Sequence, residues 1–324
     1  MVNLPTGDAI CYSGYRDGQM PSTKIYPSVA EIREDLLILR RQWQLLRLYD
    51  CSLHAERVLQ VIRAGRLNFK VMLGAYLAAE TNNPGCPWGG SYSDAVLADN
   101  RAENAEELER LISLARRYED IVFSVAVGNE ATVDWTDHLV PASRLIEYVR
   151  HVKLHVTQPV TFCENYVPWQ DKLRDLVPEL DFISVHTYPV WEYKNVHEAV
   201  RYSRDNYEGV ARLYPGKPVV ITEAGWATRS NGRGIEPDTS SEELQEIYYR
   251  DLMEWTRGAG ILTFVFEAFD EPWKGSSDPM EPEKHWGLFT GDRKPKRVMR
   301  GVYRDLTESP SSDACLTAAG DPML

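Results

Sequence analysis

The stretch Val125-Ala-Val-Gly-Asn-Glu-Ala-Thr132 contains the pattern that decides the fold. Residues 121–127 form a short apolar run rich in β-branched side chains, which predicts a buried strand. A glycine follows, and Asn129 and Glu130 then stand where this strand would end. A carboxyl at the tip of a core strand costs desolvation free energy, and stability alone does not require it there. The alternative is a helix N-cap followed by a solvated glutamate, so the rest of the chain has to distinguish the two.

Apolar runs of this kind recur along the chain and alternate with amphipathic helical patterns. Such alternation predicts a parallel sheet covered on both faces. A doubly wound open sheet is the alternative, but neither GxGxxG nor GxxxxGK[ST] follows any run. Eight units predict an α/β fold, a single-domain (β/α)8 TIM barrel over residues 1–305. The strands are expected at residues 9–12, 45–49, 69–73, 121–127, 160–163, 182–185, 219–222 and 261–266.

Capping signals place several of the helices between these strands. Ser28-Val-Ala-Glu31 is a capping box, and Ser240-Ser-Glu-Glu243 caps a later helix with an apolar stripe behind it. The pattern predicts that each strand is followed by a helix, in places after a long loop, and that a final helix covers residues 294–305. Residues 306–324 are rich in Ser, Pro and Ala, and we expect a surface-packed or disordered tail there.

Composition excludes several classes of partner. Lys and Arg number 36 and Asp and Glu 48, a net charge of −12 with no basic run, which argues against nucleic acid and anionic membrane surfaces. The sequence contains no run of 18 apolar residues and therefore predicts no membrane span. The N-terminal sequence Met-Val-Asn-Leu-Pro lacks the regions of a signal peptide. We expect a monomer, either cytoplasmic or secreted or periplasmic with its export signal removed.

The sequence offers no sign of a metal or cofactor. The five cysteines are widely spaced without CxxC, which predicts neither a disulfide framework nor a zinc site. HExxH and HxH are absent, as is a GxSxG elbow. His186 is the only histidine at a predicted strand end, and we expect it to hydrogen-bond and orient its neighbours. We therefore predict no metal, no cofactor and no catalytic thiol.

Polar and aromatic side chains are concentrated at the predicted strand ends. The carboxyl ends of barrel strands converge on one face, where active sites are built. A barrel that needed only stability would not gather carboxyls at one rim, where they repel one another. The set therefore looks functional; it comprises Tyr49, Asp50, Asn129, Glu130, Glu164, Tyr166, His186, Tyr188, Glu223, Trp226, Glu267, Asp270, Glu271, Trp273 and Lys274.

Glu130 and Glu223 follow the fourth and seventh strands and would face each other across the barrel mouth. A pair of carboxyls suits glycoside hydrolysis, in which one protonates the leaving oxygen while the other attacks the anomeric carbon or activates water. An ionised nucleophile nearby also raises the pKa of the acid and keeps it protonated. Aromatic side chains beside the pair could stack on sugar rings.

Five motifs carry a resemblance to a known family. Val127-Gly-Asn-Glu130, Ile221-Thr-Glu-Ala-Gly-Trp226 and Phe266-Glu-Ala-Phe-Asp-Glu-Pro-Trp-Lys274 resemble glycoside hydrolase family 17, the β-1,3-glucanases. Cys11-Tyr-Ser-Gly-Tyr-Arg-Asp-Gly-Gln19 and His285-Trp-Gly-Leu-Phe289 are similar to its bacterial branch. The matches span residues 9 to about 300. Each motif is weak alone, but together and in order they are specific.

The resemblance implies roles for individual residues. Glu130 matches the general acid/base, and Glu223 matches the nucleophile that forms a covalent glycosyl-enzyme. Asn129 matches the amide that holds the sugar 2-hydroxyl. The resemblance implies five further substrate-binding residues. Tyr188 would hydrogen-bond the nucleophile, and Tyr49 and Trp226 would line subsites. Glu271 and Lys274 would support the site and bind sugar hydroxyls.

Departures from the family leave specificity open. Plant members have Glu-Thr-Gly-Trp-Pro where this chain has Glu223-Ala-Gly-Trp-Ala227, and the loop after it also differs. The hypothesis is a retaining, endo-acting hydrolase of β-1,3-glucan. One alternative is a β-1,3-glucan transglycosylase with acceptor subsites that include Trp191 or Trp88, and another is a non-catalytic glucan-binding barrel. Packing at the barrel rim is the competing interpretation of Trp226 and Trp273.

Overall fold

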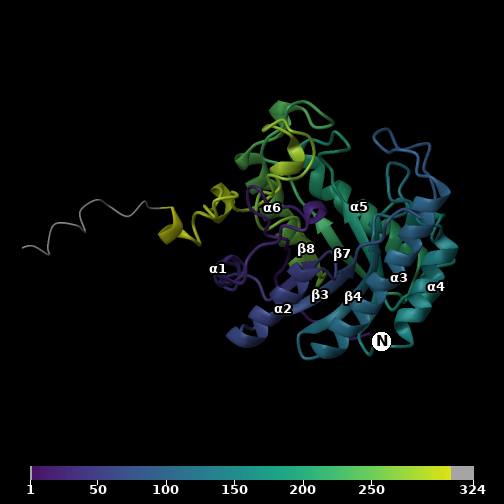
Figure 1. Cartoon of the computed structure of the whole chain (residues 1–324). Coiled ribbons are helices and arrows are strands. Elements are labelled where there is room, and N and C mark those ends of the chain that lie inside the picture. Colours follow the sequence, from purple (N-terminus) through teal and green to yellow (C-terminus); the bar gives the residue numbers. More distant parts are fainter. Residues whose placement is uncertain (1, 308–324) are drawn as a thin grey trace, which may run out of the picture.

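Eight short parallel strands close on themselves in the computed structural model, which describes residues 2–307 (Figure 1). The strands follow one another around the barrel in chain order, and β1 pairs with both β2 and β8. This confirms the predicted (β/α)8 barrel. The strands are β1 Ala9–Cys11, β2 Leu45–Leu48, β3 Lys70–Ala75, β4 Val122–Asn129, β5 Val160–Asn165, β6 Ile183–Thr187, β7 Val219–Ala224 and β8 Thr263–Val265.

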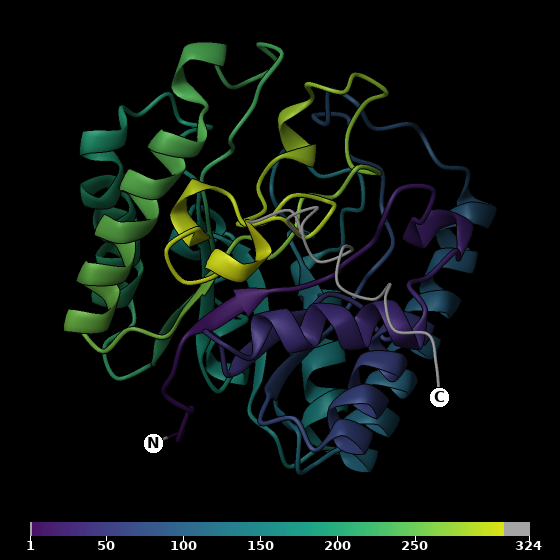
Figure 2. The ribbon, with the colours of Figure 1, turned by 90° about the vertical axis from the view of Figure 1, so that its left-hand side faces the viewer.

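Within residues 2–307, six α-helices cover the outside of the barrel, and Figure 2 shows α1 beside α2 and α5 beside α6. Each buries an apolar stripe against the strands, as amphipathic helices do. The predicted capping box at Ser28 is present, whereas the later helix is capped by Ser241, one residue after the predicted Ser240. None of the helices in residues 2–307 has the length and apolar character needed to cross a membrane. The helices are α1 Val29–Leu39, α2 Leu53–Gly65, α3 Asp94–Arg117, α4 Ala142–Lys153, α5 Val196–Leu213 and α6 Glu242–Gly258.

Two helix predictions are wrong. The segment between β5 and β6 contains only the short 3-10 helices Pro168–Gln170 and Val177–Glu179. The predicted helix over residues 294–305 is likewise replaced by the 3-10 helices Arg297–Met299 and Arg304–Leu306. Pro168 and Pro178 lack the N–H of a helical hydrogen bond, and Gly301 weakens the interior of the second predicted helix. The predicted tail begins at residue 306, so all but residues 306–307 of it lies outside the described residues.

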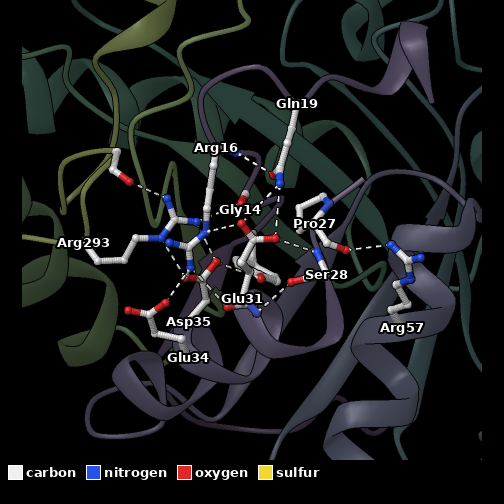
Figure 3. Close-up of polar contacts among 12 residues, drawn as sticks. Gly14, Arg16, Gln19, Pro27, Ser28, Glu31, Glu34, Asp35, Arg57 and Arg293 are labelled. Carbon is white, nitrogen blue, oxygen red and sulfur yellow. Dashed lines mark hydrogen bonds and ion pairs between the residues drawn. The ribbon is translucent and has the colours of Figure 1, made fainter. Parts of the chain in front are cut away.

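A buried ion-pair network fixes the loop between β1 and α1, which borders the mouth of the barrel (Figure 3). Asp35 on α1 is fully buried, and Arg293 donates to its two oxygens at 2.7 and 2.8 Å. Arg293 also donates to the carbonyl of Gly14 at 2.8 Å, and Arg16 donates to Asp35 at 3.1 Å. The network therefore joins the first loop, the first helix and the C-terminal part of the barrel.

Candidate active site

The two glutamates predicted to be catalytic lie together at the carboxyl ends of their strands. Glu130 directly follows β4, and Glu223 is the fifth residue of β7. One carboxylate oxygen of Glu130 and one of Glu223 lie within 4.8 Å of each other. Retaining glycosidases hold their carboxyls about 5–5.5 Å apart, whereas inverting enzymes leave about 6.5–9.5 Å for a water. The separation therefore favours direct attack by one carboxylate.

Glu223 is buried and held in its ionised form. Arg47 donates to its Oε1 at 2.5 Å, and the Tyr188 hydroxyl donates to its Oε2 at 2.5 Å. Burial by itself would raise the pKa of this carboxyl, but the charges of His186 and Arg47 and the two hydrogen bonds lower the pKa to about 2. A carboxylate that stays ionised throughout the ordinary pH range can act as a nucleophile.

His186 lies between the two carboxylates. Its Nδ1 is 2.8 Å from Glu130 Oε1 and 3.5 Å from Glu223 Oε2, and the ring is fully buried. Burial disfavours the imidazolium, but the charge of Glu223 and contacts with Cys163 and Glu130 outweigh it and raise the pKa of His186 to about 10. The positive ring stabilises the carboxylate of Glu223 and orients the side chain of Glu130 through a contact of 2.8 Å.

Glu130, His186 and Glu223 are also close enough to hold a metal ion. The Nδ1 of His186 already contacts both carboxylates, at 2.8 Å from Glu130 and 3.5 Å from Glu223. The Arg47 guanidinium already compensates the charge of Glu223. The chemistry of these groups therefore fits an ion-pair network better than a metal site.

Arg47 is a functional residue that the sequence reasoning missed. It lies in β2 within Leu-Leu-Arg-Leu, is 2% exposed, and stacks on the Tyr49 ring with 4.4 Å between the guanidinium carbon and the ring centroid. Besides Glu223 it donates to Oδ1 of Asn129, so the amide group of Asn129 is left free to donate to a ligand. The signal that could have revealed it is a single charge inside an otherwise apolar strand, since a buried charge needs a partner.

Lys274 links two buried carboxyls beside the site. Its Nζ lies 2.8 Å from Glu267 Oε2 and 2.6 Å from Glu271 Oε2. Burial raises the pKa of Glu267 well above its usual value, whereas Lys274 keeps that of Glu271 low despite burial. Glu283, which the sequence reasoning did not select, also borders the cleft. Burial raises its pKa to about 7; the charge of Lys274 opposes this rise, and the neighbouring carboxylates add to it.

An open cleft of about 1790 Å³ runs over the carboxyl ends of the strands and contains most of the predicted site. Trp88, Trp191 and Trp273 also border it. The predicted site residues that line it are Tyr49, Asn129, Glu130, Tyr188, Glu223, Glu271 and Lys274.

Trp226 does not line the cleft, and its predicted role in a sugar subsite is wrong. The side chain is 1% exposed and packs against Tyr248, with 5.4 Å between ring centroids. Its indole nitrogen donates to the carbonyl of Thr239 at 2.9 Å, so its polar atom is already satisfied inside the protein. The competing interpretation, packing at the barrel rim, is the one observed.

Sequence comparisons relate the chain to known glycoside hydrolases. Residues 9–287 match the family model described as the BtgE/BtgC glycoside hydrolase domain. A "Glucan 1,3-beta-glucosidase" of Arthroderma benhamiae is 27% identical over 284 residues, which cover 82% of this chain and 83% of that protein. A "Probable glucan endo-1,3-beta-glucosidase btgC" of Aspergillus flavus is 27% identical over 84% of this chain, but the chain spans only 40% of its length.

Solved structures share the fold. An endo-laminarinase from Formosa Hel1_33_131 superposes with a TM-score of 0.78 and 28% identity, covering 94% of this chain and 88% of that one. A glycoside hydrolase family 17 β-1,3-glucanosyltransferase from Rhizomucor miehei has a TM-score of 0.69, 23% identity and coverage of 90% and 95%, and supports the fold alone. The chain therefore belongs to the BtgE/BtgC glycoside hydrolase family, which confirms its resemblance to glycoside hydrolase family 17.

Proposed function

We propose that this protein is a retaining hydrolase of β-1,3-glucan that works by double displacement. The observation that carries the proposal is the pair of carboxyls, with oxygens within 4.8 Å and one member held ionised. The named activities of the Arthroderma protein and the Formosa laminarinase support β-1,3-glucan as the substrate. A monomer that needs no cofactor remains our expectation.

In the first step Glu223 attacks the anomeric carbon and Glu130 donates its proton to the glycosidic oxygen as the carbon–oxygen bond breaks. The product is a covalent glycosyl-enzyme on Glu223. In the second step Glu130, now a carboxylate, takes a proton from water, and the water oxygen attacks the same carbon and releases Glu223. Arg47, Tyr188 and His186 are placed to stabilise the carboxylate of Glu223 before and after the reaction.

The test is Glu223→Ala assayed on laminarin, with Glu119→Ala on the protein surface as the matched control. The catalytic variant should lose all measurable cleavage, and azide should restore turnover of an activated aryl glycoside with an inverted product, because azide fills the space of the lost nucleophile. Retention of most laminarin cleavage by Glu223→Ala would contradict the assignment. The wild-type product should keep the β configuration in NMR spectra.

A transglycosylase that uses the same intermediate is the second candidate. Trp191 and Trp88 border the cleft, as an acceptor subsite would require. Incubation with concentrated laminari-oligosaccharides distinguishes the two, since only transfer gives products longer than the substrate. A non-catalytic glucan-binding protein would bind laminarin without turnover.

We further propose endo action. Every exposed aromatic side chain in residues 2–307, namely Tyr76, Trp88, Trp135 and Tyr193, borders the cleft. Aromatic surface distributed along an open cleft suits a long chain better than a single terminal sugar. Time courses on laminarin should show a mixture of oligosaccharides early, whereas early release of one product only would favour exo action.

A further inference from the structure

The backbone that carries Glu130 has an unusual conformation. Gly128 has φ of +103° and Glu130 has φ of +44°. The left-handed region is unfavourable for a residue with a side chain, so such a conformation persists only where its surroundings enforce it. Asn129 lies two residues beyond Val127, the last residue of β4 in register with β3. The strand pairing with β3 therefore does not hold this segment in place.

The peptide group between Asn129 and Glu130 is instead fixed at both ends. Its N–H, from Glu130, donates to the carbonyl of Cys163 on β5 at 2.9 Å. Its carbonyl, from Asn129, lies 3.0 Å from Nε2 of His138, which comes from the loop between β4 and α4. A carbonyl can only accept, so Nε2 carries the hydrogen. This peptide plane lies directly before the N–Cα bond of Glu130. For a given φ, the orientation of the plane therefore determines the direction in which the Glu130 side chain points.

Three neighbours fix the ring of His138 in turn. Nδ1 lies 3.0 Å from Asp137 Oδ1 and 3.1 Å from Thr136 Oγ1, and the ring packs on Tyr76 with 5.2 Å between centroids. The side chain is 20% exposed. Burial opposes protonation, but the bonds to Asp137 and to the Asn129 carbonyl outweigh it and raise the pKa of His138. The ring is thus held as a donor to the carbonyl it contacts.

We propose that His138 is a positioning residue for the acid/base Glu130. By holding the Asn129–Glu130 peptide plane, it keeps the carboxyl in line with the oxygen of the leaving group, to which the proton moves as Glu223 bonds to the anomeric carbon. This inference rests on the proposed function, because it assigns Glu130 a proton to deliver. Its consequence is specific: loss of His138 should impair protonation of the leaving group and leave nucleophilic attack intact.

Two substrates distinguish a loss of leaving-group protonation from a loss of nucleophilic attack in the variants His138→Leu and His138→Gln. A laminari-oligosaccharide needs its leaving group protonated, whereas 2,4-dinitrophenyl β-laminaribioside has a leaving group that departs without a proton. A catalytic group misplaced by about 1 Å costs roughly 100-fold. We expect His138→Leu to lower kcat/KM for the oligosaccharide by about 10- to 100-fold and for the aryl glycoside by less than about 3-fold. His138→Gln, which keeps an N–H donor, should recover most of the loss.

His151→Leu is the control, since His151 lies on the surface of α4 and pairs with Glu109. This variant should have the wild-type kcat/KM for both substrates. Equal losses on both substrates in a folded variant, or no loss on either, would overturn the proposal. If His138→Leu does not fold, the same two substrates should be compared in Asp137→Ala. This variant keeps the imidazole of His138 but removes one of the contacts that orient it. A wild-type protein that cleaves neither substrate would refute the proposed function instead.

Discussion

Replacing Arg47 by Met should make the activity of the enzyme sensitive to acid. The guanidinium donates a hydrogen bond of 2.5 Å to Glu223 Oε1 inside the protein and contributes to the low pKa of that carboxyl, about 2. A hydrogen bond to a charged group contributes about 1.5–3 kcal/mol, and 1.36 kcal/mol corresponds to one pKa unit. The pKa of Glu223 should therefore rise by roughly one to two units. Tyr188 and His186 remain in the variant and limit the rise.

The assay is the pH profile of kcat/KM between pH 3 and 8. The nucleophile must be ionised, so activity is lost as the pH falls through the pKa of Glu223. Wild-type activity should persist towards the acid end, whereas Arg47→Met should lose half of its kcat/KM about one to two pH units higher. Arg47→Lys keeps the charge and should shift less. Arg150→Met removes an arginine that pairs with Glu179 at the surface, and serves as the control.

If folded Arg47→Met lost its activity at the same acid pH as the wild type, the prediction would be wrong. Such a result would mean that Arg47 does not lower the pKa of the nucleophile. The thermal midpoint has to be measured in parallel, because removing one partner of a buried ion pair costs about 3–5 kcal/mol of stability. Folding stability should change with pH in the same direction as activity. The lowered pKa of Glu223 stabilises the folded state at pH values above the ordinary carboxyl pKa, and this stabilisation is lost as the pH falls.

Three further predictions concern other parts of the molecule. Asp35→Asn breaks the buried pair with Arg293 and should cost about 3–5 kcal/mol in urea unfolding. Asp305→Asn, which breaks an exposed pair with Arg41, should leave the urea midpoint almost unchanged; equal costs would contradict the importance of burial. Trp88→Ala should raise KM for laminarin several-fold without changing KM for a short aryl glycoside, and Leu154→Ala, exposed outside the cleft, should change neither. His186 has a folded pKa of about 10, above its ordinary 6.5, so its contribution to stability is complete below about pH 6.5 and lost as the pH rises towards 10. The urea midpoint should fall between about pH 6.5 and 10, and it should fall less steeply in His186→Asn. If both proteins showed the same dependence of the midpoint on pH, His186 would not be its source.

The barrel could be predicted from the sequence because its strands are continuous apolar runs. Such runs predict burial on both faces, and their number predicts closure. The same logic placed Glu130 and Glu223 together, since parallel strands in a barrel present their carboxyl ends at one rim. Strand ends were less certain: β4 and β7 each extend two residues beyond the apolar run, into Asn129 and Ala224.

What could not be predicted is the direction of individual side chains. The order of residues alone does not show that Arg47 points from β2 to the carboxylate on β7, because the contact joins residues 176 positions apart. Trp226 follows a strand end like a cleft residue, but its indole turns into the protein and donates to Thr239. These outcomes depend on packing between distant segments, which local propensities do not describe.

The contact between Asp35 and Arg293 has a consequence for where this enzyme can be cut or fused. The match to the family model ends at residue 287, before Arg293 and before Lys296, which is 3% exposed and donates to Asp270 at 2.7 Å. Tyr303 is fully buried and donates to the carbonyl of Ile38. A fragment trimmed to residue 287 would leave the fully buried carboxylate of Asp35 without Arg293, which donates to both of its oxygens. We therefore expect a fragment that ends at residue 287 to be less stable than one that keeps residues 288–307.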